Sequence, residues 1–217
     1  MDVPIAEAFG RDDYERILSW THHRGTVIKA LHLPDRARTY QEAIGLILSA
    51  RDNAHIRATV SLFDPDDFSD KLFREYLKSV AKRCGLSAKN NGSFRYDAVF
   101  GFNRGESGQI PLHVRTALIQ RVKVFRDHRA LRSIAFHELS AKWALNILVV
   151  DYDDAIIGFP ESAQHTKLQE GVRLSGLHVV SPIASWYDKC VQGQATKIDL
   201  SALVDVSTRS GPTRRST

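Results

Sequence analysis

Strand-like and helix-like hydrophobic patterns alternate along the first two thirds of this chain. Residues 26–33 and 56–63 are short and rich in β-branched side chains, which predicts two strands. Between them, apolar residues recur every three or four positions over residues 39–51, which predicts a helix. Thr39 and Glu42 have the spacing of a capping box, so this helix is expected to begin at Thr39.

The alternation continues to about residue 129. A helix is predicted over residues 68–84, and Gly85 is expected to end it because glycine is common just past a last helical turn. A strand over residues 96–102 and a helix over residues 111–129 follow. Strands that alternate with helices of this length favour parallel pairing, with helices on both faces of the sheet.

The last third of the chain is richer in strands. Period-two patterns over residues 132–139, 145–150 and 155–159 predict three of them. The short, turn-rich run at residues 151–154 predicts that the last two form a β-hairpin. The expected fold class is therefore α/β, with a mixed, mostly parallel layered sheet, helices on both faces and a C-terminal β-hairpin.

The two ends of the chain carry weaker patterns. Residues 172–174 and 177–180 predict short extended pieces, and Ser181 followed by Pro182 predicts the start of a final helix. The expected organisation has three parts, which are an N-terminal helical segment at 1–24, a single α/β domain at 25–200 and a disordered basic tail at 201–217.

Composition narrows the class of protein. With 217 residues, 43% of them hydrophobic, the chain suits one globular domain with a sizeable core. Its 2 cysteines, Cys84 and Cys190, lie outside any CxxC spacing, which favours a reducing, cytoplasmic location and predicts no disulfide, metal or other cofactor. No apolar run approaches the roughly 20 residues that span a bilayer, so a soluble protein without membrane contact is expected.

The stretch at residues 145–159, LNILVVDYDDAIIGF, resembles the C-terminal hairpin of phospholipase-D-like domains. In that family a strand carrying H-x-K runs into V-V-D, a tight turn and an A-x-I-G strand. Residues 179–188, VVSPIASWYD, are similar to the closing segment of the same domains, especially of the non-catalytic versions attached to microbial transcription regulators. The resemblance covers residues 132–190 and implies a phospholipase-D-like fold.

The chain departs from the family at the catalytic positions. Counting back from V-V-D, the family's lysine falls on Asn146 and its histidine on Ala144. Alanine cannot attack phosphorus, and asparagine brings hydrogen bonds without a charge for the phosphoryl oxygens. The resemblance therefore implies a non-catalytic sensor, ligand-binding or protein-interaction module in a regulatory role, with a protein or a small ligand as partner and a homodimer as an open alternative.

A second hypothesis is a hydrolase of another class, built on polar residues at strand ends. His32 falls at the carboxyl end of the first predicted strand, where open α/β sheets place their ligands, although a hydrogen-bonded edge histidine is the simpler interpretation. Further polar residues cluster near the end of a later strand. The candidates for a pocket lining are His32, His137, Glu138, Lys142 and Asn146.

A third hypothesis is nucleic-acid binding, because the net charge is +5. Much of this charge lies on the helix predicted over residues 111–129 and on the tail, while Arg104 lies in a loop between a strand and that helix. The simpler interpretation is a solvated helix face, and no helix-turn-helix, zinc finger or aromatic stacking motif accompanies it. The candidates for anion or nucleic-acid backbone contact are Arg104, Arg115, Arg121, Lys123, Arg126 and Arg129.

Overall fold

The computed structural model describes residues 29–60, 70–104, 108–140, 146–162 and 165–203. The strands are β1 (Lys29–Leu33), β2 (His55–Val60), β3 (Arg95–Gly101), β4 (Ile134–Leu139), β5 (Asn146–Val150), β6 (Asp154–Ser162), β7 (His165–Ser175) and β8 (Thr196–Lys197). The helices are α2 (Arg36–Ser49), α3 (Lys71–Lys89), α4 (Leu112–Asp127) and α5 (Leu177–Gly193), with a short 3₁₀ turn at Leu131–Ser133.

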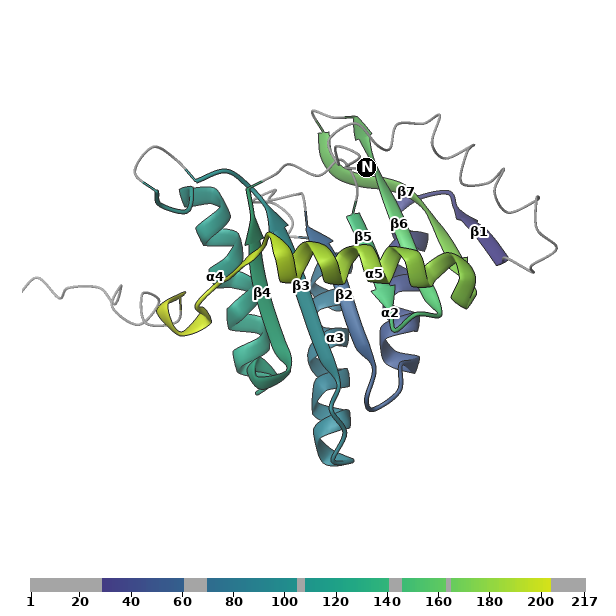
Figure 1. Ribbon diagram of the computed structural model, residues 1–217, viewed down its shortest axis with the longest axis horizontal. Coiled ribbons are helices and arrows are strands. Elements are labelled where there is room, and N and C mark those ends of the chain that lie inside the picture. The colour runs from purple at the N-terminus through teal and green to yellow at the C-terminus, as the bar shows by residue number, and fades with distance from the viewer. Residues whose placement is uncertain (1–28, 61–69, 105–107, 141–145, 163–164, 204–217) are drawn as a thin grey trace, which may run out of the picture.

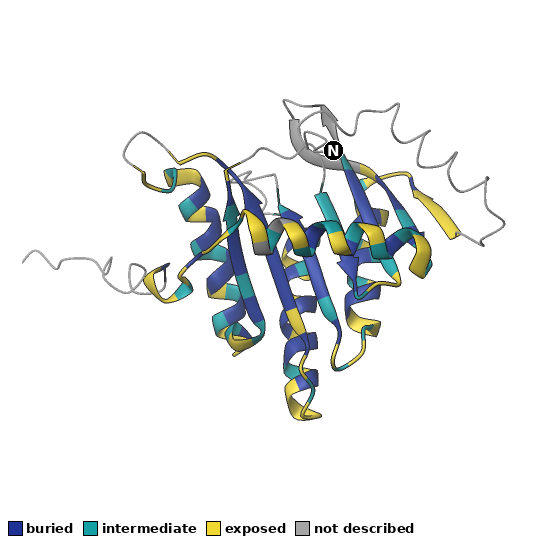
Figure 2. Ribbon diagram, in the orientation of Figure 1, coloured by how far each residue is buried: buried dark blue, intermediate teal, exposed yellow. Residues whose placement is uncertain are grey.

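All eight strands belong to one sheet with the order β1-β7-β6-β5-β2-β3-β4-β8. Helices α2, α3 and α4 cover one face of the sheet, and α5 runs across the other (Figure 1). The buried residues follow the strands and the inward sides of these helices (Figure 2). The predicted α/β class, with helices on both faces, is confirmed.

The expectation of a mostly parallel sheet is wrong. Only β2–β3 and β3–β4 pair in parallel, whereas β1–β7, β7–β6, β6–β5, β5–β2 and β4–β8 are antiparallel. The reason lies in the strand order: the β5–β6–β7 meander inserts between β1 and β2. Strands β1 and β2, which flank the first predicted crossover helix, are therefore not neighbours in the sheet. The strands inserted between them are joined by short hairpin turns, and strands joined in this way pair antiparallel.

The predicted hairpin is confirmed. Strands β5 and β6 pair in antiparallel register, with Leu148 opposite Ile156 and Val150 opposite Asp154. Asp151 takes a φ of 52° in the turn, a left-handed conformation that aspartate tolerates better than most side chains.

Two predicted helix boundaries are wrong. Helix α2 begins before Thr39, because Asp35 is its N-cap and accepts a hydrogen bond from the Arg38 N–H at 2.7 Å. Helix α3 does not stop at Gly85 but continues to Lys89. There the buried Ser87 hydroxyl donates to the Asp52 carbonyl at 2.6 Å, so a tertiary contact holds the extra turn.

The final helix begins earlier than predicted. Residues 177–180 form the first turn of α5 rather than an extended piece, and Pro182 lies inside the helix. Gly176, with a φ of 126°, makes the turn out of β7, and its carbonyl accepts from the Val179 and Val180 N–H groups. Residues 1–24, predicted as a helical segment, and residues 204–217 of the tail predicted at 201–217 lie outside the described residues. Of that predicted tail, residues 201–203 are described, and they are helical with Leu203 buried.

Candidate functional site

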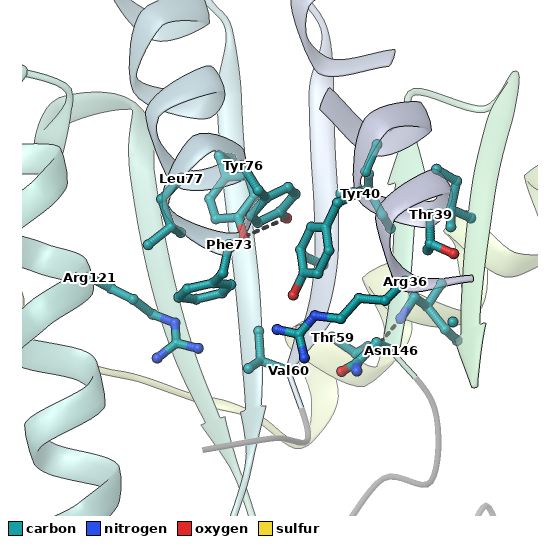
Figure 3. Close-up of a pocket in the computed structure, with 17 residues that line it drawn as sticks. Arg36, Thr39, Tyr40, Thr59, Val60, Phe73, Tyr76, Leu77, Arg121 and Asn146 are labelled. Atoms are coloured by element: carbon teal, nitrogen blue, oxygen red, sulfur yellow. Dashed lines mark hydrogen bonds between the residues drawn. The ribbon is translucent and has the colours of Figure 1, made fainter. Parts of the chain in front are cut away.

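A cavity of about 100 Å³ lies between helices α2, α3 and α4 and the sheet, next to the carboxyl end of β2 (Figure 3). Most of its lining surface is apolar, but the lining also includes several hydrogen-bonding side chains, with two arginines and no carboxylate among them. The polar lining residues are Arg36, Thr39, Tyr40, Thr59, Tyr76, Tyr96, Arg121 and Asn146.

Arg36 reaches the cavity from the first turn of α2. Its guanidinium carbon lies 5.5 Å from the centre of the Tyr40 ring, and Nη2 pairs with Asp70 at 2.5 Å. Asp70 in turn caps α3 by accepting from the Leu72 N–H at 2.7 Å. The N-terminal turns of α2 and α3 are thus tied together beside the cavity, and helix N-termini favour anions.

Arg121 reaches the cavity from the inward side of α4. It is only 3% exposed, and its Nη1 donates to the Ala117 carbonyl at 3.2 Å. Its guanidinium carbon lies 4.9 Å from the Phe73 ring centre and 5.7 Å from that of Phe100, so aromatic faces offset part of the cost of a buried charge. Figure 3 shows the guanidinium groups of Arg36 and Arg121 directed toward the cavity from opposite sides.

Neutral hydrogen-bonding groups complete the polar lining. The hydroxyls of Tyr76 and Tyr96 lie 3.1 Å apart, and burial raises the pKa of Tyr76 well above 10.0 and also raises that of Tyr96. Both therefore stay protonated hydroxyls at neutral pH. The Thr59 hydroxyl accepts from the Ile147 N–H at 2.8 Å, which fixes the start of β5 against β2.

Of the five residues predicted to line one pocket, Asn146 does line this cavity. It is the first residue of β5 and lies opposite Gly158 of β6. His32 lies on β1, at one end of the strand order, where its Nε2 is 3.3 Å from Glu170 Oε2. His137 lies on β4, with five strands between it and β1. The structure therefore does not bring His32 and His137 together.

The remaining pocket candidates are placed elsewhere. Glu138 forms a fork with Arg104, whose Nε and Nη2 donate to its carboxylate at 2.8 and 2.7 Å. Arg104 also donates to the Gly108 carbonyl at 2.8 Å, so this pair fastens the loop after β3 to β4. Lys142 lies outside the described residues.

The six predicted anion-contact residues do not form one site. Arg121 is buried in the cavity, whereas Lys123 and Arg129 are exposed to solvent. Arg115 and Arg126 are partly exposed on α4, and Arg104 is engaged by Glu138.

Sequence reasoning missed Arg36, Tyr40, Thr59 and Tyr76 as site residues. Arg121 was grouped with the exposed cations of its helix, although its position in the helical repeat places it on the buried side. It falls in the same helical stripe as Val114, Leu118 and Phe125, all of which are buried. An arginine in an apolar stripe is the signal that would have distinguished it from its basic neighbours.

The opposite face of the sheet carries a second group of buried charges, beneath α5. Arg57, 3% exposed, makes a two-pronged ion pair with Asp188 of α5 at 2.7 and 2.9 Å. Its Nη1 also donates to the Asp151 carbonyl at 2.9 Å, and its guanidinium carbon lies 4.9 Å from the Tyr152 ring centre. Burial lowers the pKa of Arg57, but the bond to Asp188 outweighs this and the pKa is raised.

Asp97 is the buried acid of the same face. Its carboxylate accepts from His55 Nε2 at 2.9 Å and from Arg95 Nε at 3.0 Å. Burial raises the pKa of Asp97, yet the bonds from His55 and Arg95 outweigh it and leave the pKa below 3.8. Tyr187 of α5 donates to the Asp97 carbonyl at 2.8 Å, so this network also anchors α5 to the sheet.

In the described part of the chain, no group of three or more His, Cys, Asp or Glu side chains is placed to hold a metal ion. Among the same residues, none of the helices combines the length and the apolar character needed to cross a membrane.

No protein-family model and no curated protein matches this sequence. Among solved structures, TrmBL2, an archaeal chromatin protein described with a novel mode of DNA binding, is similar over 87% of this chain and 62% of its own, with 12% identity and a TM-score of 0.49. Phosphatidylserine synthase from Haemophilus influenzae Rd KW20 is similar over 84% of this chain and 44% of its own, with 9% identity and a TM-score of 0.49. NucT from Helicobacter pylori is similar over 79% of this chain and 99% of its own, with 14% identity and a TM-score of 0.46.

The chain spans less than two thirds of the length of the first two structures. At identities this low the likeness concerns the fold alone. The protein is thus an α/β protein with a cavity between three of its helices and one face of its sheet.

Proposed function

We propose that this chain is a ligand-binding module that holds a phosphoryl group, free or on a small molecule, between α2, α3 and α4 without cleaving it. The observation that carries this proposal is the position of Arg36 and Arg121, which come from different helices and border one cavity. Arg36 is paired with Asp70 outside the lining, and two guanidinium groups at one cavity favour an anion, because arginine forks match phosphate oxygens.

The size and surroundings of the cavity support a small ligand group. At about 100 Å³ it is below the roughly 300 Å³ at which drug-sized pockets begin, but it has room for a phosphate. The Thr39 and Thr59 hydroxyls, the tyrosine hydroxyls and the Asn146 amide offer further hydrogen bonds. A larger ligand would place only its phosphoryl group here.

The described lining lacks the histidine and lysine on which the phospholipase-D-like pattern relies for phosphodiester cleavage. Among the described lining residues there is no His, Cys, Lys, Asp or Glu to act as nucleophile or general base. Asn146 stands where the phospholipase-D-like pattern has its lysine. Binding without turnover, which suits a sensor, is the function that this set of side chains supports best.

Binding is tested by calorimetric titration of the full chain with inorganic phosphate, pyrophosphate and glycerol phosphate. We expect saturable binding that Arg36→Met and Arg121→Met each weaken at least tenfold, since methionine keeps the stem and removes the charge. Arg38→Met is the matched control, because Arg38 lies on the same helix, 50% exposed, and pairs with Glu42. Equal affinity in wild type and Arg121→Met, or no saturable binding, would contradict the proposal.

The absence of turnover is tested separately, with phosphodiester and phospholipid substrates. We expect product formation at background rates. Turnover that disappears in Asn146→Ala, while Arg38→Met retains it, would show that the cavity is catalytic and overturn this half of the proposal.

A further inference from the structure

Basic residues are concentrated in two neighbouring stretches of the chain. Helix α3 and residues 112–132 together carry 12 of the 30 basic residues and only 2 of the 25 acidic ones. The remaining sequence therefore has an excess of acidic residues, and the net charge of +5 understates how strongly charge is segregated. This feature is independent of the cavity and goes beyond the function proposed above.

Eight of these 12 cations are exposed to solvent, five of them on α3, one on α4 and two just after α4. Helix α3 presents Arg74, Lys78 and Lys82, all exposed, at intervals of four residues. With a rise of 1.5 Å per residue, they form a row about 12 Å long on one side of the helix. Helices α3 and α4 pack against each other on the same face of the sheet. The other exposed cations of the two stretches are Lys71, Lys89, Lys123, Arg129 and Arg132.

Few acids neutralise this surface. Glu75 lies 3.9 Å from Lys71, and Asp127 lies 3.9 Å from Arg126, both at the outer limit for an ion pair. Within the described residues, Lys78, Lys82 and Lys123 make no ion pair. A surface of this kind carries an unbalanced positive potential that attracts polyanions.

We infer that the outer face of α3 and α4 binds duplex DNA through its phosphates, without reading its sequence. Lysine and arginine on the outside of regular helices contact phosphates, which carry no sequence information. In the described part of α3 and α4 no aromatic side chain is exposed, so the platform on which single strands stack is missing there.

A membrane surface fits this face less well than DNA. Interfacial helices combine basic residues with an exposed apolar stripe. The exposed apolar side chains of these two helices are Leu86, near the end of α3, and Leu112, at the start of α4, and they form no stripe.

The inference is tested by fluorescence anisotropy of the full chain with a labelled 20-base-pair duplex, over about 50 to 200 mM salt. We expect an affinity that falls steeply with salt, because bound phosphates release counterions. Lys78→Glu, Lys82→Glu and Lys123→Glu, combined in one variant, should weaken binding at least tenfold at 50 mM salt and flatten the salt dependence by about one unit of slope per lysine lost.

The matched control is Lys29→Glu, Lys189→Glu and Lys197→Glu in one variant. These three lysines are also exposed and change the net charge by the same amount, but they lie on β1, α5 and β8. We expect the control to bind within about threefold of wild type. Equal weakening in both variants would mean that overall charge governs binding, and would overturn the inference.

Two further variants separate this face from the rest of the protein. Changing Arg209, Arg214 and Arg215 to serine removes the three positive charges of residues 204–217, and Arg121→Met removes charge from the cavity. We expect both to bind the duplex like wild type. No binding at 50 mM salt, loss of binding on changing the three C-terminal arginines alone, or preference for single strands, duplex RNA or anionic vesicles would each overturn the assignment to duplex DNA.

Discussion

The two faces of the sheet use buried charge in different ways. Beneath α5, the buried side chains of Arg57 and Asp97 each meet oppositely charged protein groups at 2.7 to 3.0 Å. Beneath α2, α3 and α4, Arg121 is as deeply buried as Arg57, but it borders a cavity of about 100 Å³, and its contacts include the Phe73 ring and the Ala117 carbonyl. The first arrangement holds a helix in place, whereas the second leaves room for a ligand.

This difference distinguishes buried charges that stabilise the fold from buried charges that can bind a ligand. When the protein itself supplies the partners of a buried arginine, the pair contributes to the free energy of unfolding. Removing one partner then leaves an uncompensated buried charge. An arginine that borders a cavity can in addition bind a group that the folded chain does not provide. The comparison therefore predicts opposite consequences for mutations on the two faces.

The largest effect is expected at the α5 face. Asp188→Ala should lower the free energy of unfolding by about 3 kcal/mol, because Arg57 keeps its charge in a buried position without its carboxylate. Urea denaturation measures this. The double variant Arg57→Met, Asp188→Leu should recover much of the loss, since two apolar residues replace the pair. If Asp188→Ala unfolds at the same urea concentration as wild type, the ion pair does not anchor α5.

At the cavity face, the expected effect is on binding rather than on stability. Phosphate at 100 times its Kd should raise the free energy of unfolding of the wild type by about 2.7 kcal/mol, and that of Arg121→Met hardly at all. Without phosphate, Arg121→Met should cost less stability than Asp188→Ala, because methionine keeps the packing of the side-chain stem between the helices and the sheet. A large loss of stability without ligand would instead make Arg121 a structural residue like Arg57.

A smaller effect is expected from His137, which also faces Asp97. Burial lowers its pKa below 6.5; Asp97 opposes this shift, and Arg95 and Lys197 reinforce it. Among the described residues its buried Nε2 has no hydrogen-bond partner. The unfolded chain therefore binds a proton more readily than the folded one, so stability should fall as pH drops through 6.5 toward the lowered pKa.

His137→Leu isolates this contribution. We expect the variant to lose less stability than wild type between pH 7 and pH 5, as measured by thermal unfolding at each pH. Asp97 does not interfere in this range, because its pKa is below 3.8 and its stabilisation is lost only at lower pH. The same pH slope in both proteins would rule out His137 as the titrating group.

Local patterns predicted the hairpin and most elements, because turn residues and periodicity act over a few positions. The sheet direction was not predictable in this way, since the insertion of β5, β6 and β7 beside β2 is a tertiary choice. Residues 177–180 are three apolar residues and a histidine, and two of them are β-branched. This pattern favours a strand, yet packing against the sheet makes the segment helical.

The candidate site was predictable only in part. Asn146 was found because the hairpin around it has a recognisable pattern. Arg36 and Tyr76 are 40 residues apart, and only the packing of α2 against α3 brings them to one cavity. The burial of Arg121 was predictable from the sequence, since it lies in an apolar stripe of its helix. Grouping it with the neighbouring basic residues hid this pattern.

The smallest effect is expected for an ion pair that is exposed, which serves as a reference for the buried pair of Arg57 and Asp188. Arg51 and Asp153 form an ion pair at 2.9 Å, with side chains 73% and 53% exposed. Arg51→Ala should change the free energy of unfolding by less than about 0.5 kcal/mol, because water screens the charges and already solvates both partners. Measured by urea denaturation beside Asp188→Ala, it tests whether the strength of the α5-face pair comes from burial. A loss as large as that of Asp188→Ala would mean that pairing alone, wherever it lies, accounts for the difference between the two faces.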